Sequence, residues 1–408
     1  MNTSEIDAIR DSKENKTEPD NLFDYDLETY FLKPGQLASH YTSMETFSAI
    51  IKTDGFWASQ ARFSNDDTEL TFAKDRFNQW LKKKKVAQAG SLVPDVYMVA
   101  LCSDDDLLSQ WRGYCRDKEG ISISFDLSAR RPFYLKGPSG ISETLYLHVQ
   151  PVFYNWGRFQ KALDQGLLSQ LPKIGNNVLF AYPFIKHPKF KEEKEHRLAL
   201  VNLNNQFGGY IQYRQAESGK IPYIEIRPGI KDGSTRDCNI RLNTDPVREK
   251  LLLDAFQAEH VTAAVVRCRD RNPSVAYDDD WCFGCSMRQI EIPNRSKENC
   301  AFLHGTACNL SIRQNSVMIA EGKDQKALFE QVSSVVDSLN EKLQKKDKLK
   351  IWCEGHLPIR KLRVGNTRKT NDARELIEHI CLHGEYYWLK YVDVNITNIP
   401  YRPPLKFQ

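Results

Sequence analysis

Long hydrophobic runs and a strong net charge are both missing from this sequence of 408 residues. No stretch approaches the roughly 20 apolar residues that cross a bilayer, so we do not expect a membrane protein. The 57 basic and 53 acidic residues leave a formal charge of +4. That charge is too small to indicate nucleic-acid binding by the whole surface, so any basic patch has to be local.

Common nucleotide and hydrolase motifs are also missing: there is no Walker loop, no G-x-G-x-x-G and no G-x-S-x-G. Residues 1–21 are polar and lack the apolar core of a signal peptide. We therefore predict a disordered leader over 1–22 and a cytoplasmic protein. The 10 cysteines then indicate reduced thiols, with one metal site as an alternative, rather than a disulfide framework.

Hydrophobic residues make up 41% of the chain and aromatic residues 11%, enough for a real core and roughly two or three structural units. We predict an α+β fold with a mixed or antiparallel sheet and flanking helices. Period-two alternation over 121–127 predicts a half-buried strand. Further strands are predicted at 37–41, 56–59, 96–101 and 198–201, and helices at 44–55, 66–85, 104–114 and within 157–185.

Between about 205 and 350 the pattern of predicted elements changes. Short strand-like pieces occur at 210–213 and 221–226, and the helix predicted over 324–345 carries an apolar stripe that favours core packing. A helix at 372–383 and a strand at 391–396 follow. We predict a main domain of 23–205 plus 356–408, and an inserted subdomain of 206–355 through which a protein partner would bind.

Two carboxylates lie one residue apart at Glu193 and Glu195, followed by Arg197. On a strand these three side chains share a face. Neighbouring carboxylates repel, so one has a raised pKa unless a cation such as Arg197 intervenes. The arrangement suits stabilising a positive charge, orienting a hydroxyl or binding a metal. The alternative is a solvated salt bridge at a sheet edge.

The tripeptide His40-Tyr41-Thr42 lies where a predicted strand meets a predicted helix, with Thr42 and Glu45 at capping-box spacing. His and Tyr at such a junction offer hydrogen bonds and a stacking face to a nucleotide or sugar. A buried core histidine is the alternative.

Two further groups carry metal-ligand chemistry. Asp66 and Glu69 share one face of a predicted helix and suit a divalent metal, although helix capping explains the same residues more simply and is the preferred interpretation. Downstream, a C-x2-C pair with more cysteines and a histidine is the ligand inventory of structural zinc, with small buried cysteines as the alternative. The zinc candidates are Cys282, Cys285, Cys300, His304 and Cys308.

A series of motifs runs in order along the chain. It consists of 40–43, Ile50, 57–59, Asn65, Asp66, Glu69, 110–114, 120–126, Lys186, Phe190, 193–195, Arg197 and 396–402. This series resembles the bacterial domain-of-unknown-function family 2971 (DUF2971). The resemblance covers about 30–205 and 358–403. The sequence departs from the family pattern at His196, where an aromatic residue is expected, and at Thr397, where serine is expected.

The opening His-Tyr-Thr, its helix and short strand, and the later Glu-x-Glu strand are also similar to the layout of ADP-ribosyltransferases. This second resemblance implies an ADP-ribosyltransferase-like fold with a large insertion, and NAD as the substrate. It implies that His40 contacts the ribose with Thr42 beside it, that Tyr41 or Tyr114 stacks on nicotinamide, and that Arg197 tunes the carboxylates or contacts phosphate. Glu195 is then the catalytic carboxylate with Glu193 assisting, or the two are exchanged.

The resemblance predicts an NAD-consuming transferase or glycohydrolase, acting as a toxin or phage-defence effector on a nucleic acid or protein. A carboxylate near the nicotinamide–ribose bond would stabilise an oxocarbenium-like state. We therefore expect His40, Tyr114, Glu193 and Glu195 to share one cleft. The alternatives are a metal-dependent nuclease using Asp66, Glu69, Glu193 and Glu195, and a non-enzymatic sensor or interaction protein.

Overall fold

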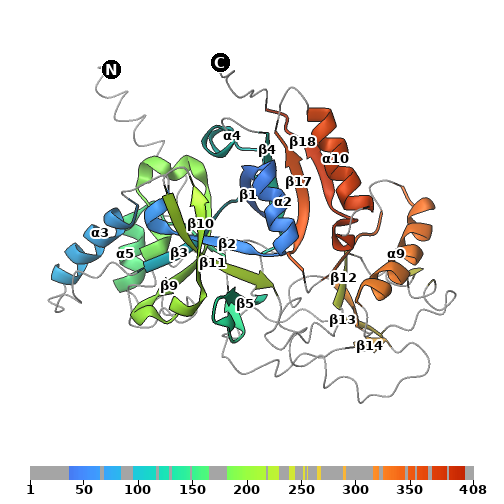
Figure 1. Ribbon diagram of the computed structural model, residues 1–408, viewed down its shortest axis with the longest axis horizontal. Helices are drawn as coiled ribbons and strands as arrows, with labels where there is room; N and C mark the ends of the chain where they lie inside the picture. The colour runs from blue at the N-terminus through green and yellow to red at the C-terminus, as the bar shows by residue number, and fades with distance from the viewer. Residues whose placement is uncertain are drawn as a thin grey trace, which may run out of the picture.

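A computed structural model describes somewhat more than half of the chain and confirms the α+β class (Figure 1). The described residues are 36–64, 69–83, 95–115, 119–127, 131–147, 149–164, 182–216, 219–228, 239–243, 251–252, 255, 264–267, 288–290, 316–320, 325–344, 348–353, 356–365, 370–383 and 386–399. Among them, no helix is long and apolar enough to cross a membrane.

The main sheet has 13 strands in the described residues, with the order β18-β17-β4-β1-β3-β2-β11-β5-β6 and with β7, β8, β9 and β10 paired beside this path. Its pairings are antiparallel except for β17 and β18, which run parallel. The strands are β1 (Ala38–Ser43), β2 (Phe56–Gln60), β3 (Asp95–Cys102), β4 (Gly120–Phe125), β5 (Arg131–Gly137), β6 (Gly140–Ile141), β7 (Leu145–Leu147), β8 (Gln150–Pro151), β9 (Glu195–Asn202), β10 (Ile211–Ala216), β11 (Gly219–Pro228), β17 (Ile359–Val364) and β18 (Asp393–Ile396).

The main sheet branches at β3. Strand β9 pairs with β3 along its full length, ending with Glu195 opposite Cys102. On the other edge of β3, β2 pairs at Tyr97 and Met98, whereas β1 pairs only at Cys102. Strands β1 and β2 therefore leave β3 in different directions (Figure 1).

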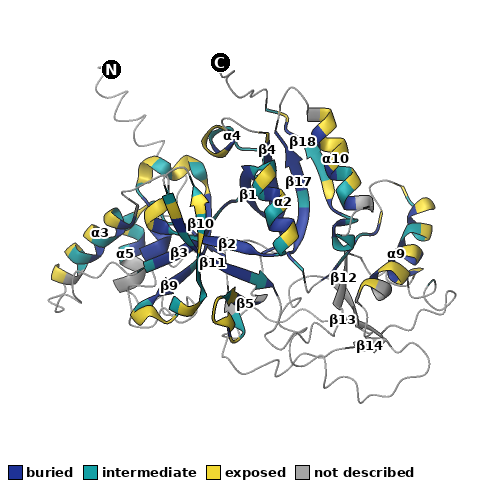
Figure 2. Cartoon of the chain, in the orientation of Figure 1, coloured by how far each residue is buried: buried dark blue, intermediate teal, exposed yellow. Residues whose placement is uncertain are grey.

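Helices cover both faces of this sheet. On one face α2 (Met44–Thr53) and α10 (Thr370–His383) contribute to the largest apolar core, which also holds Ile121, Ile123 and Leu362. On the other face, Leu70 of α3 (Glu69–Lys83) packs against β3, and Trp111 of α4 (Leu108–Tyr114) packs against Tyr41. The strands between these helices are deeply buried (Figure 2).

Strand β4 is buried on both faces, so the prediction of a half-buried strand there is wrong. Its polar positions, Ser122 and Ser124, have no exposed surface. The Ser124 hydroxyl forms a hydrogen bond with the Ser39 hydroxyl at 2.9 Å. The alternation of apolar residues and serines does mark an apolar and a polar face of β4. Neighbouring elements, however, cover the polar face as well as the apolar one.

The start of α2 differs from the predicted capping box by one residue. Ser43 is the N-cap, and its hydroxyl accepts the Thr46 backbone N–H at 3.2 Å. The helix ends at Asp54, which takes the left-handed conformation with φ 48°, one residue before the predicted stop at Gly55. The first shift follows from two adjacent hydroxyl residues, Thr42 and Ser43, either of which can cap the helix.

A smaller sheet of five strands lies beyond β11 in the sequence, with the order β14-β13-β15-β12-β16. Helix α9 (Gln325–Glu341) buries Phe329, Val332, Val335 and Val336, which confirms core packing for its apolar stripe. Strands β10 and β11 fall in the range 206–355 and yet extend the main sheet. The small sheet consists of β12 (Asn239–Asn243), β13 (Ala264–Arg267), β14 (Arg288–Ile290), β15 (Ser316–Ala320) and β16 (Ile351–Cys353).

Candidate functional site

Four charged side chains, which we call the carboxylate cluster, meet where the 3-10 helix η7 (Pro188–Glu193) runs into β9. Lys186 Nζ donates to Glu193 Oε2 at 2.7 Å and to Glu195 Oε2 at 3.0 Å. Arg197 donates to both oxygens of Glu195, at 2.7 Å from Nε and 2.8 Å from a terminal nitrogen. The cluster thus consists of Lys186, Glu193, Glu195 and Arg197.

The backbone turn at Lys194 brings the two carboxylates to the same lysine. Lys194 takes the left-handed conformation with φ 48°, which ends η7 and starts β9. Glu193 therefore approaches from a 3-10 turn and only Glu195 from a strand, so strand alternation is not what unites them. The Lys194 side chain points elsewhere, with Nζ 2.9 Å from Asp104 Oδ2.

Two anions and two cations balance within the carboxylate cluster. Desolvation lowers the pKa of Lys186, but the negative charges of Glu195 and Glu193 outweigh it and the net direction is upward. Lys186 therefore stays charged and stands where the sequence suggested a metal. Arg197 has no exposed side-chain surface and also donates to the Pro183 carbonyl. Its role is to hold Glu195, and the expected contact with a phosphate is not available to it.

Tyr114 approaches the carboxylate cluster from the end of α4. Desolvation raises the pKa of its hydroxyl to about 12, and the negative charges of Glu195 and Glu193 add to the effect. The side chain as a whole is still 42% exposed. Helix α4, which ends at Tyr114, contacts η7, so the accessible Tyr114 lies near Glu193 and Glu195.

Tyr41 contributes to packing between β1 and α4. The Tyr41 hydroxyl donates to the Asp104 carbonyl at 2.9 Å and accepts the Leu107 backbone N–H at 2.7 Å. Its ring meets Trp111 edge to face at 4.9 Å. Thr42 is buried. Of the two tyrosines predicted to stack on nicotinamide, Tyr114 is thus the accessible one.

His40 projects from the other face of β1. Ser39 pairs with Cys102, which pairs with Glu195, so these three side chains share a face. His40, next to Ser39, points to the opposite face by strand alternation. Its Nδ1 contacts the Ala100 carbonyl at 2.9 Å, at the branch of the sheet. The expectation that His40 shares one cleft with Glu193 and Glu195 is therefore wrong.

A polar group that the sequence analysis missed lies near His40. Burial lowers the pKa of His40, and the positive charge of Arg214 on β10 lowers it further. Arg214 donates to the Ser59 hydroxyl on β2 at 3.2 Å. Its Nε, like Trp57 Nε1, is buried without a hydrogen-bond partner among the described residues. Arg214 escaped notice because its range was assigned to the insertion, and only sheet pairing places it here.

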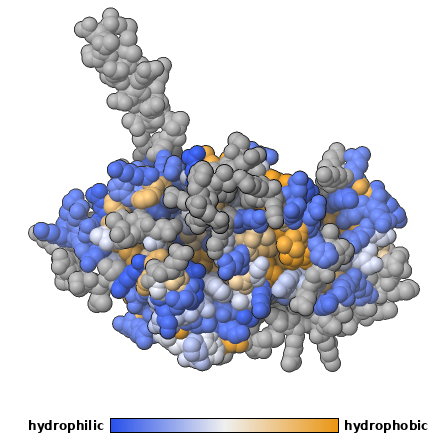
Figure 3. Space-filling model, turned by 45° about the horizontal axis from the view of Figure 1, so that its top comes forward, coloured by the Kyte–Doolittle hydropathy of each residue, from blue (hydrophilic) through white to orange (hydrophobic). Residues whose placement is uncertain are grey.

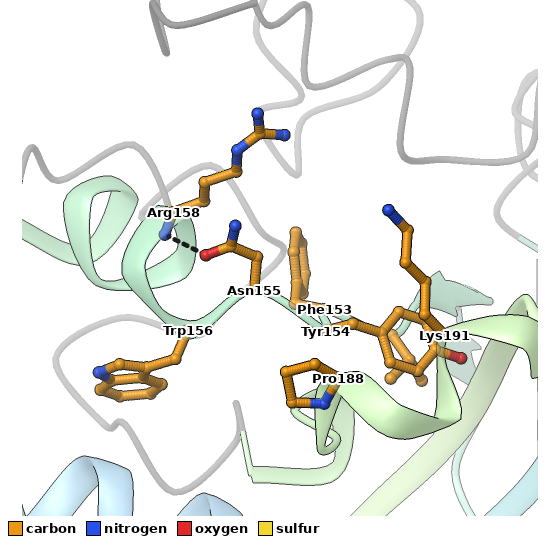
Figure 4. Close-up of a pocket in the computed structure, with 8 residues that line it drawn as sticks. Phe153, Tyr154, Asn155, Trp156, Arg158, Pro188 and Lys191 are labelled. Carbon is orange, nitrogen blue, oxygen red and sulfur yellow. Dashed lines mark hydrogen bonds between the residues drawn. The ribbon is translucent and has the colours of Figure 1, made fainter. Parts of the chain in front are cut away.

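A pocket of about 420 Å³ lies beside the carboxylate cluster, between the start of α5 (Trp156–Asp164) and η7. Tyr154 connects the two: its ring lines the pocket, and its hydroxyl accepts the Glu195 backbone N–H at 3.0 Å. Figure 4 shows Arg158 and Lys191 rising on either side of Phe153. The lining residues are Val152, Phe153, Tyr154, Asn155, Trp156, Arg158, Pro188 and Lys191.

The predicted metal ligands are not placed by the structure. Asn65, Asp66 and the five zinc candidates lie outside the described residues, as does the side chain of Glu69. Within the described part of the chain, no three His, Cys, Asp or Glu side chains gather as a metal site. The zinc and divalent-metal hypotheses stay predictions.

Comparison with known families finds a match over part of the chain. The family described as "Protein of unknown function (DUF2971)" matches residues 110–198, from α4 into β9. This range contains Tyr114, the whole carboxylate cluster and the pocket, and the match supports the DUF2971 family for this part of the chain. No curated protein and no solved structure matches, and none of these comparisons supports the resemblance to ADP-ribosyltransferases.

Proposed function

We propose that the protein is an ADP-ribosyltransferase-like enzyme that consumes NAD, with its reacting centre at Tyr114 and Glu193. One observation supports this proposal above the others. An accessible tyrosine from α4 and two carboxylates from η7 and β9, distant in sequence, converge beside a pocket. An aromatic ring and acids close to a cavity are a frequent composition of a ligand site.

Glu193 is the better candidate for facing substrate. Its side chain is 21% exposed, against 6% for Glu195. Both oxygens of Glu195 are already engaged by Arg197, and one of them also by Lys186. We therefore assign the exchanged roles, with Glu193 as the catalytic carboxylate and Glu195 as a positioning residue that acts through Lys186.

The reaction breaks the bond between the nicotinamide nitrogen and ribose C1′. Nicotinamide leaves with the bonding electron pair, and the carboxylate of Glu193 stabilises the positive charge that develops on the sugar. The Tyr114 ring provides a face on which nicotinamide stacks. An acceptor oxygen or nitrogen, or water, then attacks C1′ and loses its proton to Glu193.

Nicotinamide release from NAD by the purified protein tests the proposal, with Glu193→Gln and the adjacent exposed Glu192→Gln as a matched pair. We expect Glu193→Gln to lose at least about 100-fold in turnover and Glu192→Gln to stay within about twofold, with equal urea midpoints. Tyr114→Phe keeps the stacking face and the activity, and chelator has no effect. Absence of both NAD binding and nicotinamide release by the wild type, or full activity of Glu193→Gln, overturns the proposal.

A role as a toxin or phage-defence effector belongs to the same proposal. Modification of a macromolecule by ADP-ribose would arrest growth when the protein is expressed in a bacterium. We expect the arrest to require Glu193 and to be unaffected by Glu192→Gln. Growth arrest by the Glu193→Gln variant at the same expression level would contradict an enzymatic cause and favour the alternative of a non-enzymatic interaction protein.

A further inference from the structure

The floor of the pocket is a rigid piece of chain. Phe153 donates its backbone N–H to the Phe184 carbonyl at 2.7 Å and accepts the Lys186 N–H at 3.2 Å. One residue earlier, Val152 donates to the Glu195 carbonyl at 3.0 Å. The floor is therefore tied on both sides to the segments that carry the carboxylate cluster, and the pocket is preformed.

The walls of the pocket are aromatic, and its rim is cationic. Phe153, Tyr154 and Trp156 line it together with Arg158 and Lys191. The Trp156 ring is held in place by Phe77 of α3, edge to face at 5.2 Å, and by its Nε1, which donates to Gln160 at 3.0 Å. Aromatic faces and cations in one cavity match the two parts of a nucleotide, a flat base and a phosphate.

Asn155 adds a polar group that can read a base edge. Its Oδ1 accepts the Arg158 backbone N–H at 3.2 Å. The amide nitrogen consequently points to the side of the pocket on which the Arg158 guanidinium and the Lys191 ammonium lie (Figure 4). Side-chain amides form hydrogen bonds with acceptor atoms of bases.

Basic and aromatic side chains continue beyond the pocket. On α3, Arg76 lies over the Phe72 ring at 5.2 Å, and that ring contacts His187 at 5.1 Å, next to the pocket residue Pro188. Lys189 and Lys191 are exposed on η7. Among the described side chains of α3 and η7, the exposed acids are Asp75 and Glu192. Hydrophilic side chains are prominent at the α3 end of the molecule (Figure 3).

We infer that this pocket binds one nucleotide of a single-stranded nucleic acid, the acceptor in the proposed reaction. The base lies among the aromatic walls, and Arg158 and Lys191 contact the flanking phosphates. A base within a duplex is stacked and paired, so a single strand enters at lower cost. An acidic peptide would use the same cations but leave the aromatic walls without a flat partner. The inference rests on the proposed function only where it makes the strand the acceptor of the reaction, because binding of the strand itself needs no NAD.

Fluorescence anisotropy with 12-nucleotide single strands of DNA and RNA, in the absence of NAD, tests the inference. We expect affinity to fall as salt rises and the matched duplex to bind at least about tenfold more weakly. The double variant Arg158→Glu/Lys191→Glu should lose at least about tenfold in affinity. The control Lys220→Glu changes an exposed lysine on β11 outside the pocket and should stay within about twofold.

Three results overturn the inference: no binding of either strand, equal binding by the double variant, or equal binding of a poly-glutamate peptide. The anisotropy measurement contains no NAD and the nicotinamide-release assay contains no strand, so the two assays separate the inference from the proposed function. Strand binding without nicotinamide release overturns the proposed function alone. Nicotinamide release without strand binding overturns the inference alone.

Discussion

Arg197 holds both carboxylate oxygens of Glu195, at 2.7 and 2.8 Å, from a position where its own side chain has no exposed surface. The flat guanidinium presents two parallel donors, so this contact sets the rotation of the carboxylate as well as its position. The second oxygen then meets Lys186, and Lys186 in turn reaches Glu193. The orientation of the accessible acid thus depends on a buried arginine.

Arg197→Leu should destabilise the protein by about 3–5 kcal/mol, because it removes the main partner of a buried carboxylate. The free energy of urea unfolding measures this loss, with the exposed Lys220→Ala as a control that changes it by less than about 0.5 kcal/mol. Arg197→Lys keeps the charge but loses the bidentate contact with Glu195. Its loss of unfolding free energy should lie between those of Arg197→Leu and Lys220→Ala. A loss below about 1 kcal/mol for Arg197→Leu would show that Lys186 alone satisfies Glu195.

Tyr41→Phe should cost about 1–3 kcal/mol, because the Leu107 N–H and the Asp104 carbonyl both lose the hydroxyl that joins them. The same substitution at Tyr213, whose side chain is 65% exposed on β10, should be neutral within about 0.5 kcal/mol. Urea unfolding compares the two variants. Equal effects would mean that water replaces the Tyr41 hydroxyl.

The pattern of neighbouring residues predicted many helices and strands of the fold. The features that it missed depend on pairing between strands that are distant in the sequence. The strand before Thr42 and the strand containing Leu198 were both found from local signals. The branch at β3 was not, because it depends on where β1 and β2 leave the same edge of one strand. The place of β10 and β11 in the main sheet depends on the pairing of Tyr223 with Ser59, which no local signal reveals.

In the candidate site, too, the sequence predicted some features correctly and missed those that depend on the backbone conformation or on distant contacts. The proximity of Glu193 and Glu195 was predicted, but through strand alternation, whereas the left-handed Lys194 is the cause. A place for Tyr114 beside them was expected only from the resemblance to ADP-ribosyltransferases, and in the structure the charges of Glu195 and Glu193 act on the Tyr114 hydroxyl. From the sequence, Lys186 was identified only as a motif position. A lysine seven residues before one acid and nine before another gives no sign of whether its side chain points into the protein to pair with them.

His40 makes stability depend on pH below neutrality. Burial lowers its folded pKa below 6.5, so the unfolded chain binds a proton at a higher pH than the folded one does. The contribution of the neutral His40 to the free energy of unfolding is therefore fully present above pH 6.5, and it is lost as the pH falls through the folded pKa. Wild type should lose more unfolding free energy than His40→Gln between pH 7.5 and about 5. Parallel pH profiles of the two proteins would contradict this.

Two glycines of the α4–β4 unit should respond to alanine with opposite signs. A Cβ at Gly120 would lie 2.4 Å from Cys115 Cβ and Sγ, so Gly120→Ala should cost at least about 1–3 kcal/mol. Gly113 is a helical position with nothing within 4 Å, and Gly113→Ala should gain about 0.5–1 kcal/mol. Thermal unfolding measures both. An unchanged or raised Tm for Gly120→Ala would contradict the packing against Cys115, and a lowered Tm for Gly113→Ala would contradict the open space at that position.

Strand β17 fills the edge of β4, although the whole stretch from Phe125 to Ile359 separates them in the chain. A ribosome that has just released β4 has therefore exposed a strand of Ile121, Ile123 and Phe125 whose neighbour has not yet been made. Until the last part of the chain emerges, that edge is open to pairing with other chains. Correct assembly of this protein thus depends on late synthesis, and chaperone protection during translation would matter most for this one edge.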